Sequence, residues 1–296
     1  MKILILTGGN SSERKISFMS ANNVKNALKE NGHFVKLYDL KNGYQQIKKI
    51  AKDFDVLFPV LHGEEGEGGK LHKFLSKINK PIVGSRNYQA FQKAWYKIPF
   101  KIFCGKNGIK TAGWKIVKDK NDVIKFGFPC VLKASSGGSS REVVILKSEK
   151  NLKRKDFKKL IISKNPLFVE EYLEGTEVTV GILNDKALPI IEIIPPKGSW
   201  FSYENKYVST TQEIPNAPSL DERTKKKIQD IAVKIHKTFN LGSYSRIDFI
   251  VFNNISYVLE VNTIPGLTAG SLIPKAAKAS GISFNQMMEI LIKSAK

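Results

Sequence analysis

The stretch SRIDFIVFNNISYVLEVN, residues 245–262, has two runs of β-branched and aromatic residues on either side of Asn253-Asn254. Two such runs separated by an asparagine pair are typical of a β-hairpin, because asparagine tolerates the left-handed backbone of a two-residue turn. The pattern predicts two paired strands, Ser245–Phe252 and Ile255–Asn262.

Three oxygen-bearing side chains lie near the open end of this hairpin. A turn near residue 254 brings Asp248 roughly opposite Glu260, and Asn262 lies two residues further on, so it points to the same face as Glu260. Hard oxygen ligands without histidine or cysteine suit Mg²⁺, particularly where phosphates and waters complete the octahedron. The hairpin therefore predicts a magnesium site, although three solvent-facing polar residues would give the same spacing.

The flanking segments extend this strand-rich region in both directions. Downstream, the Pro265-Gly266 turn and Ser271 predict a loop that holds a substrate next to the metal. Upstream, Val178–Leu183 and Ala187–Ile194 predict a second hairpin, and a helix is expected over Asp221–Phe239.

The chain start has a different pattern. Lys2–Thr7 is a buried apolar run, and strand and helix patterns alternate over residues 1–86, which predicts a parallel sheet covered by helices. Residues 87–171 begin with a helix expected over Tyr88–Lys106 and continue with short strands. The sequence thus predicts an α/β protein, α+β overall, with three domains over residues 1–86, 87–171 and 172–296.

A glycine-serine loop joins two of the short strands in the second domain. It reads KASSGGSS over residues 133–140. Such a loop exposes backbone N–H groups to phosphate oxygens, and Lys133 adds a positive charge. No Gly-Lys-Ser/Thr leads into a helix, so the loop is not a Walker A motif, and a simple hairpin loop remains the alternative.

Polar residues follow two strands of the first domain. Glu13 lies in the first turn of the first helix, and His62 ends the third strand. Both are expected at the carboxyl edge of the sheet, where open α/β sheets bind ligands. A helix-dipole partner and a structural histidine are the alternatives. The acidic, glycine-rich segment 64–69 is unlike a core element.

The composition is that of a globular protein, with 42% hydrophobic residues and a formal net charge of +21. The positive charge is nearly all lysine and spread along the chain, and no aromatic-interleaved or helix-turn-helix pattern stands out. We therefore expect no dedicated nucleic-acid partner. No apolar run reaches the length of a signal-peptide core or a membrane helix, which predicts a cytoplasmic protein without a membrane partner. The two cysteines, Cys104 and Cys130, indicate neither a disulfide framework nor a zinc site.

Taken together, these motifs resemble the ATP-grasp superfamily and, within it, the D-alanine:D-alanine ligases. The resemblance extends over essentially the whole chain and follows nine segments in order: LTGGNSSERKIS (6–17), LHGEEGEGG (61–69), PIVGS (81–85), VLKASSGGSS (131–140), VEEYLEGTEVTV (169–180), YENKY (203–207), SRIDF (245–249), LEVNTIPG (259–266) and SLIP (271–274). The YENKY segment is the most informative of these, because it resembles the D-alanine-specific ligases rather than the superfamily at large.

The resemblance implies a fold and an activity. The fold is an N-terminal parallel α/β domain followed by two α+β subdomains that sandwich ATP. The activity is the ligation of two D-alanines to D-alanyl-D-alanine through a D-alanyl phosphate, for peptidoglycan precursor synthesis. The implied cofactors are ATP and two Mg²⁺ ions, with Mn²⁺ able to take their place. A homodimer is also implied.

The resemblance further implies roles for individual residues. Glu13 would hold the ammonium of the first D-alanine, with His62 as a helper, and Arg246 and the Gly266 N–H would stabilise the oxyanion. Lys206 and Ser271 would bind the carboxylate of the second D-alanine. The remaining implied residues form a latch over the site (Glu13, Ser139, Tyr207), bind the nucleotide (Lys93, Lys133, Ser140, Glu170, Glu171, Tyr172, Leu173, Glu177) and hold the metal (Asp248, Glu260, Asn262).

Several positions depart from the family pattern. Arg141 and Glu142 stand where the family usually has a small apolar residue and a glycine, Gly68 stands where an acid is usual, and His72 replaces a usual glutamine. Three alternatives therefore stay open. They are a ligase with another second substrate such as D-lactate, D-serine or a different amino acid, a weakly active nucleotide-binding paralogue, and a basic nucleic-acid binder.

Overall fold

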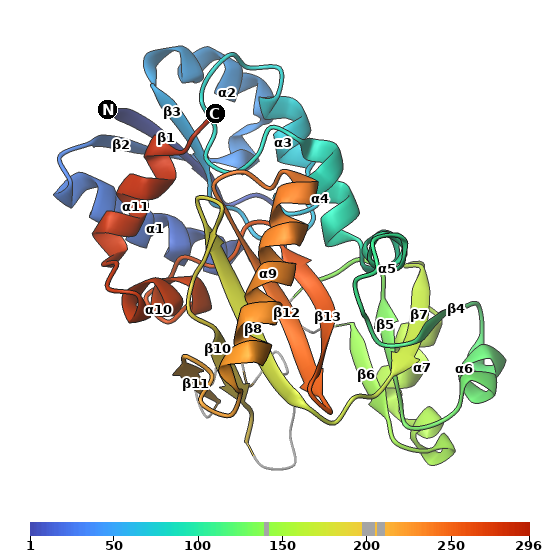
Figure 1. Ribbon diagram of the computed structural model, residues 1–296. Helices are drawn as coiled ribbons and strands as arrows, with labels where there is room; N and C mark the ends of the chain where they lie inside the picture. Colours follow the sequence, from blue (N-terminus) through green and yellow to red (C-terminus); the bar gives the residue numbers. More distant parts are fainter. Residues whose placement is uncertain (139–141, 197–204, 206–210) are drawn as a thin grey trace.

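The computed structural model describes residues 1–138, 142–196, 205 and 211–296. It contains a three-stranded, a four-stranded and a six-stranded sheet, each with helices packed nearby (Figure 1). The predicted α/β class is confirmed. Within these ranges, no helix is both long and apolar enough to cross a membrane.

The three-stranded sheet is parallel, as the sequence predicts. Its order is β2-β1-β3, with β1 over Lys2–Thr7, β2 over Phe34–Asp39 and β3 over Val56–Pro59. Ile3 to Leu6 of β1 are fully buried, which explains the unbroken apolar run. A single parallel bridge between Leu57 and Ile82 adds to this sheet beside β3. The helical segments of this region are α1 (Arg14–Glu30), η1 (Leu40–Asn42), α2 (Tyr44–Ile50), η2 (Ala51–Asp53) and α3 (Lys70–Leu75).

The four-stranded sheet is antiparallel and has its own small core. Its order is β4-β7-β5-β6, with β4 over Trp114–Val117, β5 over Cys130–Ala134, β6 over Val143–Leu146 and β7 over Leu167–Glu171. Its helical segments are α6 (Lys120–Phe126), η3 (Glu149–Lys153) and α7 (Lys155–Ile161). The extended backbone of Arg154 separates η3 from α7.

The six-stranded sheet contains the predicted hairpin, whose strands are β12 and β13. Strands β11, β10, β8, β12 and β13 follow one another, and β9 pairs with β8. Their bounds are β8 Thr176–Leu183, β9 Lys186–Ala187, β10 Ile191–Ile194, β11 Gln212–Pro215, β12 Tyr244–Phe252 and β13 Ile255–Asn262. The helices of this region are α9 (Glu222–Phe239), α10 (Leu272–Ala279) and α11 (Phe284–Lys293).

The register of the β12–β13 hairpin agrees with the sequence prediction. Asp248 pairs with Glu260, and both turn residues, Asn253 and Asn254, have positive φ. The register shifts between Asp248 and Phe249. Such irregularities re-aim side chains and occur next to functional sites.

The long helix predicted over Tyr88–Lys106 is divided in the structure. Helix α4 covers Tyr88–Trp95, α5 covers Lys97–Lys106, and Tyr96 between them has extended backbone. Pro99 explains the division, because inside one continuous helix its ring would clash with the Trp95 carbonyl. With the break at Tyr96, Pro99 lies in the first turn of α5, where proline is tolerated.

One large core joins the chain start to the chain end. Buried side chains of β1, α1, β8, α9 and α11 belong to a single cluster, and α1 lies beside α11 in Figure 1. Backbone hydrogen bonds join Ile82 and Lys296 in both directions. Gly242 packs so closely on Gly84 that a Cβ at Gly242 would lie 1.8 Å from the Gly84 carbonyl oxygen. The three-stranded and six-stranded sheets are thus held together by a continuous interior.

Candidate active site

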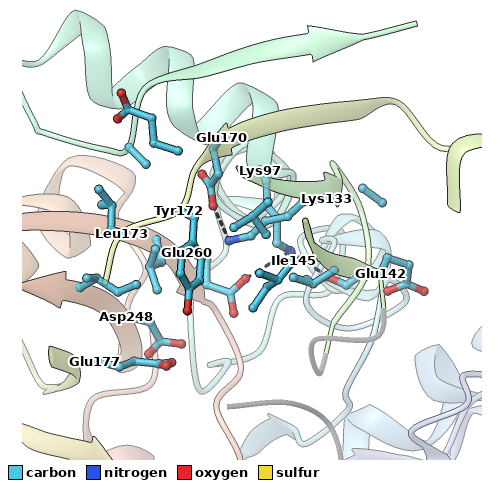
Figure 2. Close-up of a pocket in the computed structure, with 18 of the residues that line it drawn as sticks. Lys97, Lys133, Glu142, Ile145, Glu170, Tyr172, Leu173, Glu177, Asp248 and Glu260 are labelled. Carbon is cyan, nitrogen blue, oxygen red and sulfur yellow. Dashed lines mark hydrogen bonds and ion pairs between the residues drawn. The ribbon is translucent and has the colours of Figure 1, made fainter. Parts of the chain in front are cut away.

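The first cavity lies between the four-stranded sheet and the six-stranded sheet (Figure 2). The four-stranded sheet contributes Lys133, Val131 and Glu170, and the β12–β13 hairpin contributes Asp248 and Glu260. Apolar side chains such as Ile145, Leu173, Ile250 and Leu259 share its wall with these charged groups. An apolar slot with charged groups at one part of its wall suits a flat aromatic ring joined to an anionic group.

Glu170 is the most enclosed charged group of the first cavity. Its side chain is 3% exposed, and its two carboxylate oxygens lie 2.5 Å from the ammonium groups of Lys101 and Lys133. Burial alone raises the pKa of Glu170, but the two lysines outweigh this effect and its pKa lies below the usual value. Glu170 is therefore ionised, and its carboxylate is occupied by lysines.

The two lysines respond differently to this carboxylate. Burial lowers the pKa of Lys133, but Glu170, Glu260 and Glu177 more than reverse the effect and raise it. Burial dominates for Lys101, and its pKa is lowered although Glu170 opposes the shift. Lys133 is therefore positively charged, and it lies on the wall of the first cavity.

Helix α5 brings Lys97 to the same cavity. The Lys97 ammonium lies 3.2 Å from the Glu260 carboxylate and donates to the Gly137 carbonyl at 2.9 Å. It therefore links the hairpin to the glycine-serine loop. The family resemblance implies Lys93 as a nucleotide-binding residue, but the structure places Lys97 rather than Lys93 at this cavity. Lys93 is exposed on α4, the helix that ends before the break at Tyr96. It lines neither of the two described cavities.

The three predicted metal ligands come close together at the end of the hairpin. The Asn262 amide donates to Asp248 at 3.0 Å, and Asp248 faces Glu260 across the strands. Arg246 donates twice to Asp248, at 2.9 and 2.8 Å, and the Thr179 hydroxyl donates at 2.5 Å. Asp248 and Glu260 each have a cation beside them, Arg246 and Lys97 respectively, yet both carboxylates line the first cavity.

This donor set fits a divalent cation. Two carboxylates and an amide oxygen on neighbouring strand positions provide the hard oxygen ligands that Mg²⁺ prefers. Glu177 adds a third carboxylate to the wall that Asp248 and Glu260 share. The cations that accompany these carboxylates, Arg246 and Lys97, show that positive charge is favoured at this place.

A second cavity adjoins the first and has a volume of about 680 Å³, within the usual range of small-molecule sites. Its wall includes Glu13, His62, Arg246, Gly266 and Ser271, which the sequence analysis selects from distant segments. Four residues line both cavities: Lys97, Gly137, Gly138 and Glu260. The two cavities therefore meet where the glycine-serine loop faces the hairpin.

Two serines of α1 hold His62 in the wall of the second cavity. The Ser17 hydroxyl accepts from the His62 backbone N–H at 3.0 Å, and the Ser20 hydroxyl lies 3.4 Å from Nε2. Burial lowers the pKa of His62 although Glu13 opposes the shift. His62 is therefore a neutral imidazole at physiological pH.

Glu67 is a residue of this wall that the sequence analysis does not select. It is 7% exposed, and its carboxylate accepts from the Gly63 N–H at 2.8 Å. Burial and the charge of Glu13 raise the pKa of Glu67 to about 8. The segment EEGEGG has three acids, and its sequence pattern cannot distinguish the buried one. A buried glutamate beside a glutamate and an arginine is a typical functional-site environment.

The loop after the hairpin brings two of the predicted residues together. The Ser271 hydroxyl accepts from the Thr268 N–H at 3.0 Å, and a Cβ at Gly266 would lie 2.8 Å from this hydroxyl. The backbone at Gly266 is therefore close to the side chain of Ser271. Both line the second cavity.

The remaining predicted residues divide into two sets. Glu171, Tyr172, Leu173 and Glu177 line the first cavity together with Glu170. Ser139, Ser140, Lys206 and Tyr207 lie outside the described residues. Sequence patterns do not identify three charged residues at or next to the cavities, Lys97, Lys101 and Glu67. Only packing between distant segments distinguishes them from other lysines and glutamates.

Comparisons with known proteins agree with this arrangement. The model of the family described as "D-ala D-ala ligase C-terminus" matches residues 100–293. The chain is 36% identical to the D-alanine–D-alanine ligase of Maridesulfovibrio salexigens, over 99% of this chain and 98% of that protein. It is 37% identical to that of Aquifex aeolicus, over 99% of this chain and all of that protein.

A solved structure shows the same fold. The crystal structure of the D-alanine–D-alanine ligase from Bacillus anthracis complexed with ATP superposes with a TM-score of 0.85 at 29% identity. It covers 99% of this chain and 97% of that one. The ATP-grasp fold implied by the resemblance is confirmed. The chain belongs to the D-alanine–D-alanine ligase family.

Proposed function

We propose that this member of the D-alanine–D-alanine ligase family joins two D-alanines to D-alanyl-D-alanine with the hydrolysis of ATP to ADP and phosphate, for peptidoglycan precursor synthesis. The observation that carries the proposal is the meeting of two cavities at Lys97, Gly137, Gly138 and Glu260. A phosphoryl donor in the first cavity and a carboxylate acceptor in the second would react at this junction.

The first cavity would bind ATP. Lys133 and Lys97 would neutralise its phosphates, and the glycine-serine loop with Ser140 would offer backbone and hydroxyl donors. The backbone of Glu170 to Leu173 would bind the adenine edge, and Glu177 would accept from the ribose hydroxyls. The mixture of apolar wall and paired charges supports this assignment.

Asp248, Glu260 and Asn262 would hold Mg²⁺, with Mn²⁺ able to replace it and a second ion expected beside the phosphates. When bound, the metal would neutralise charge on the transferred phosphoryl group and orient it. The close donor set at the end of the hairpin supports this proposal.

The second cavity would bind the two amino acids. Glu13 would accept from the ammonium of the first D-alanine, whose carboxylate attacks the terminal phosphorus of ATP and releases ADP. Ser271 and Lys206 would bind the carboxylate of the second D-alanine. Its amine, after losing a proton, attacks the acyl carbon of the D-alanyl phosphate, and phosphate leaves.

Other polar groups of this cavity would assist the reaction in three ways. Arg246 and the Gly266 N–H would stabilise the oxyanion that forms when the amine attacks. Neutral His62 and protonated Glu67 would lie near the substrates without adding charge. Glu13, Ser139 and Tyr207 would form a latch that excludes water, since water would hydrolyse the acyl phosphate.

We further propose three properties that the family relationship supports. The chain would act in the cytoplasm, where ATP is available, and it would form a homodimer. The division into domains 1–86, 87–171 and 172–296 would place one sheet in each domain, as the strand bounds allow.

The deciding experiment measures both products. The purified protein is incubated with ATP, Mg²⁺ and D-alanine, and phosphate release and D-alanyl-D-alanine are followed together. Equal amounts of both, absent with L-alanine, are expected. D-lactate and D-serine, each supplied with D-alanine, test the acceptor. Phosphate release with either acceptor but no D-alanyl-D-alanine would overturn the proposal.

A further inference from the structure

Lys101 is the most deeply buried lysine of the site. Its side chain is 2% exposed, and it lies on α5 one turn beyond Lys97. The ammonium contacts Glu170 and donates to the Thr111 hydroxyl at 2.5 Å, while the Phe168 ring lies 5.6 Å away. Lys101 is not among the residues that line either described cavity. It therefore acts on a ligand only through another residue.

Lys101, Glu170 and Lys133 form a row with one anion between two cations. One oxygen of Glu170 faces Lys101 and the other faces Lys133. Lys133 lines the first cavity (Figure 2), and its side chain is 15% exposed. The row as a whole has a net charge of +1. Without Lys101, the buried pair of Glu170 and Lys133 would be neutral.

Burying this lysine costs free energy that a hydrophobic residue would not cost. A methionine or leucine on α5 could fill a similar volume, and such replacements of buried ion pairs are often neutral or stabilising. Glu170 needs only one cation to be compensated, and Lys133 already provides it. The second buried lysine is thus not explained by the stability of the ion pair alone.

We propose that Lys101 is a positioning residue that keeps the charge of Lys133 available to the nucleotide phosphates, by neutralising the Glu170 carboxylate from behind. The inference rests on the proposed function, since it takes the first cavity to be the ATP site. It extends the proposal to a residue outside the cavity wall. Both lysines of α5 would then keep positive charge available to the phosphates. Lys97 would do so by direct contact, and Lys101 by neutralising Glu170.

The test compares nucleotide binding by the Lys101→Met variant and the wild type without D-alanine. Dissociation constants are measured by calorimetry for Mg²⁺-ATP, Mg²⁺-ADP and adenosine. We expect ATP and ADP to bind about tenfold more weakly to the variant, with adenosine unchanged, because only the phosphates meet Lys133. Equal loss for adenosine and ATP, or no loss for ATP, would overturn the proposal.

A double variant separates this role from a structural one. In Lys101→Met/Glu170→Gln both buried charges are absent, so the carboxylate in contact with Lys133 no longer neutralises it. We expect this variant to recover most of the ATP affinity lost in Lys101→Met. It leaves Lys133 without its Glu170 partner but still on the wall of the first cavity, and unchanged adenosine binding serves as the check that the variant is folded. ATP binding as weak as in the single variant, or lost while adenosine still binds, contradicts the inference.

The proposed function fails in a different measurement. If the wild type binds ATP but forms no D-alanyl-D-alanine, the reaction is wrong and the role of Lys101 can still be tested. If the wild type binds ATP and the two variants do not differ from each other, the role of Lys101 is wrong and the reaction stands.

Discussion

Two pairs of buried ionisable groups, one pair in each cavity, have opposite charge states. In the first cavity Glu170 lies between two lysines, and its pKa is lowered while that of Lys133 is raised, so both stay charged. In the second cavity burial lowers the pKa of His62 and raises that of Glu67 to about 8, so both become neutral. A site for a polyanion needs fixed charge. A site where an amine loses its proton and an acyl group is transferred benefits from neutral polar groups.

The electrostatic difference follows from packing. Lys101 and Lys133 reach Glu170 from a helix and a neighbouring strand, which gives its carboxylate two cations at contact distance. Glu67 instead shares its surroundings with Glu13, and the guanidinium of Arg246 is already paired with Asp248. The same residue type is therefore charged in one cavity and protonated in the other.

The largest effect is expected where the cavities meet. Glu260→Gln removes a carboxylate that lines both cavities and that we assign to Mg²⁺. We expect the rate of D-alanyl-D-alanine formation to fall at least about a hundredfold. Glu149→Gln, a change on a solvent-facing segment of the four-stranded-sheet region, is the matched control and should be unaffected. Equal rates for the two variants would refute the metal assignment.

A second prediction concerns the lysine that joins the cavities. Lys97→Met should lower kcat/KM for ATP roughly 10- to 100-fold, because Lys97 bridges Glu260 and the glycine-serine loop. Lys93→Met, on the exposed face of α4, should stay within about twofold of the wild type. Steady-state kinetics of both variants test the corrected position. A larger effect at Lys93 would restore the sequence-based assignment.

The neutral state of Glu67 predicts how stability depends on pH. The folded protein keeps the proton of Glu67 up to pH about 8, whereas a glutamate in the unfolded chain releases it near its usual pKa of 4.5. Between these values the folded state binds more protons, so this group contributes stability that is fully present below 4.5 and is lost as pH rises to about 8.

Glu67→Gln removes this titration. The Tm of the wild type should therefore fall more steeply than that of Glu67→Gln between pH 5 and 8, measured by thermal unfolding at constant ionic strength. Parallel Tm profiles for the two proteins would show that Glu67 is ionised in the folded state, and the contrast between the cavities would be lost.

The smallest effect is expected from Glu142, whose carboxylate lines the first cavity and lies against Gly137. Glu142→Gln removes one negative charge from the wall that faces the phosphates. We expect the affinity for ATP to rise about threefold at low salt and less at high salt. Calorimetric titration at two ionic strengths measures it. Weaker ATP binding by the variant would mean that this carboxylate assists the nucleotide.

Much of the fold could be predicted from local sequence patterns. The buried run of β1, the β12–β13 hairpin and α9 each have a period or a capping residue that specifies the element. The asparagine pair at 253–254 sets the register next to the turn, where Phe252 pairs with Ile255, and the register shift between Asp248 and Phe249 then brings Asp248 opposite Glu260. Local patterns therefore predicted that the two carboxylates come close together, whereas the register shift that aligns them is seen only in the structure.

The sequence by itself thus determined the α/β class, the hairpin and, through its ordered motifs, the family. Only the tertiary structure decided which lysine and which acid serve the site. Pro99 divides the helix and brings Lys97, not Lys93, to the junction, and long-range packing buries Glu67 rather than its acidic neighbours. Lys101 meets Glu170 across 69 positions of sequence, and no local pattern predicts such a pair, because burial and charge compensation depend on segments that meet only in the folded chain.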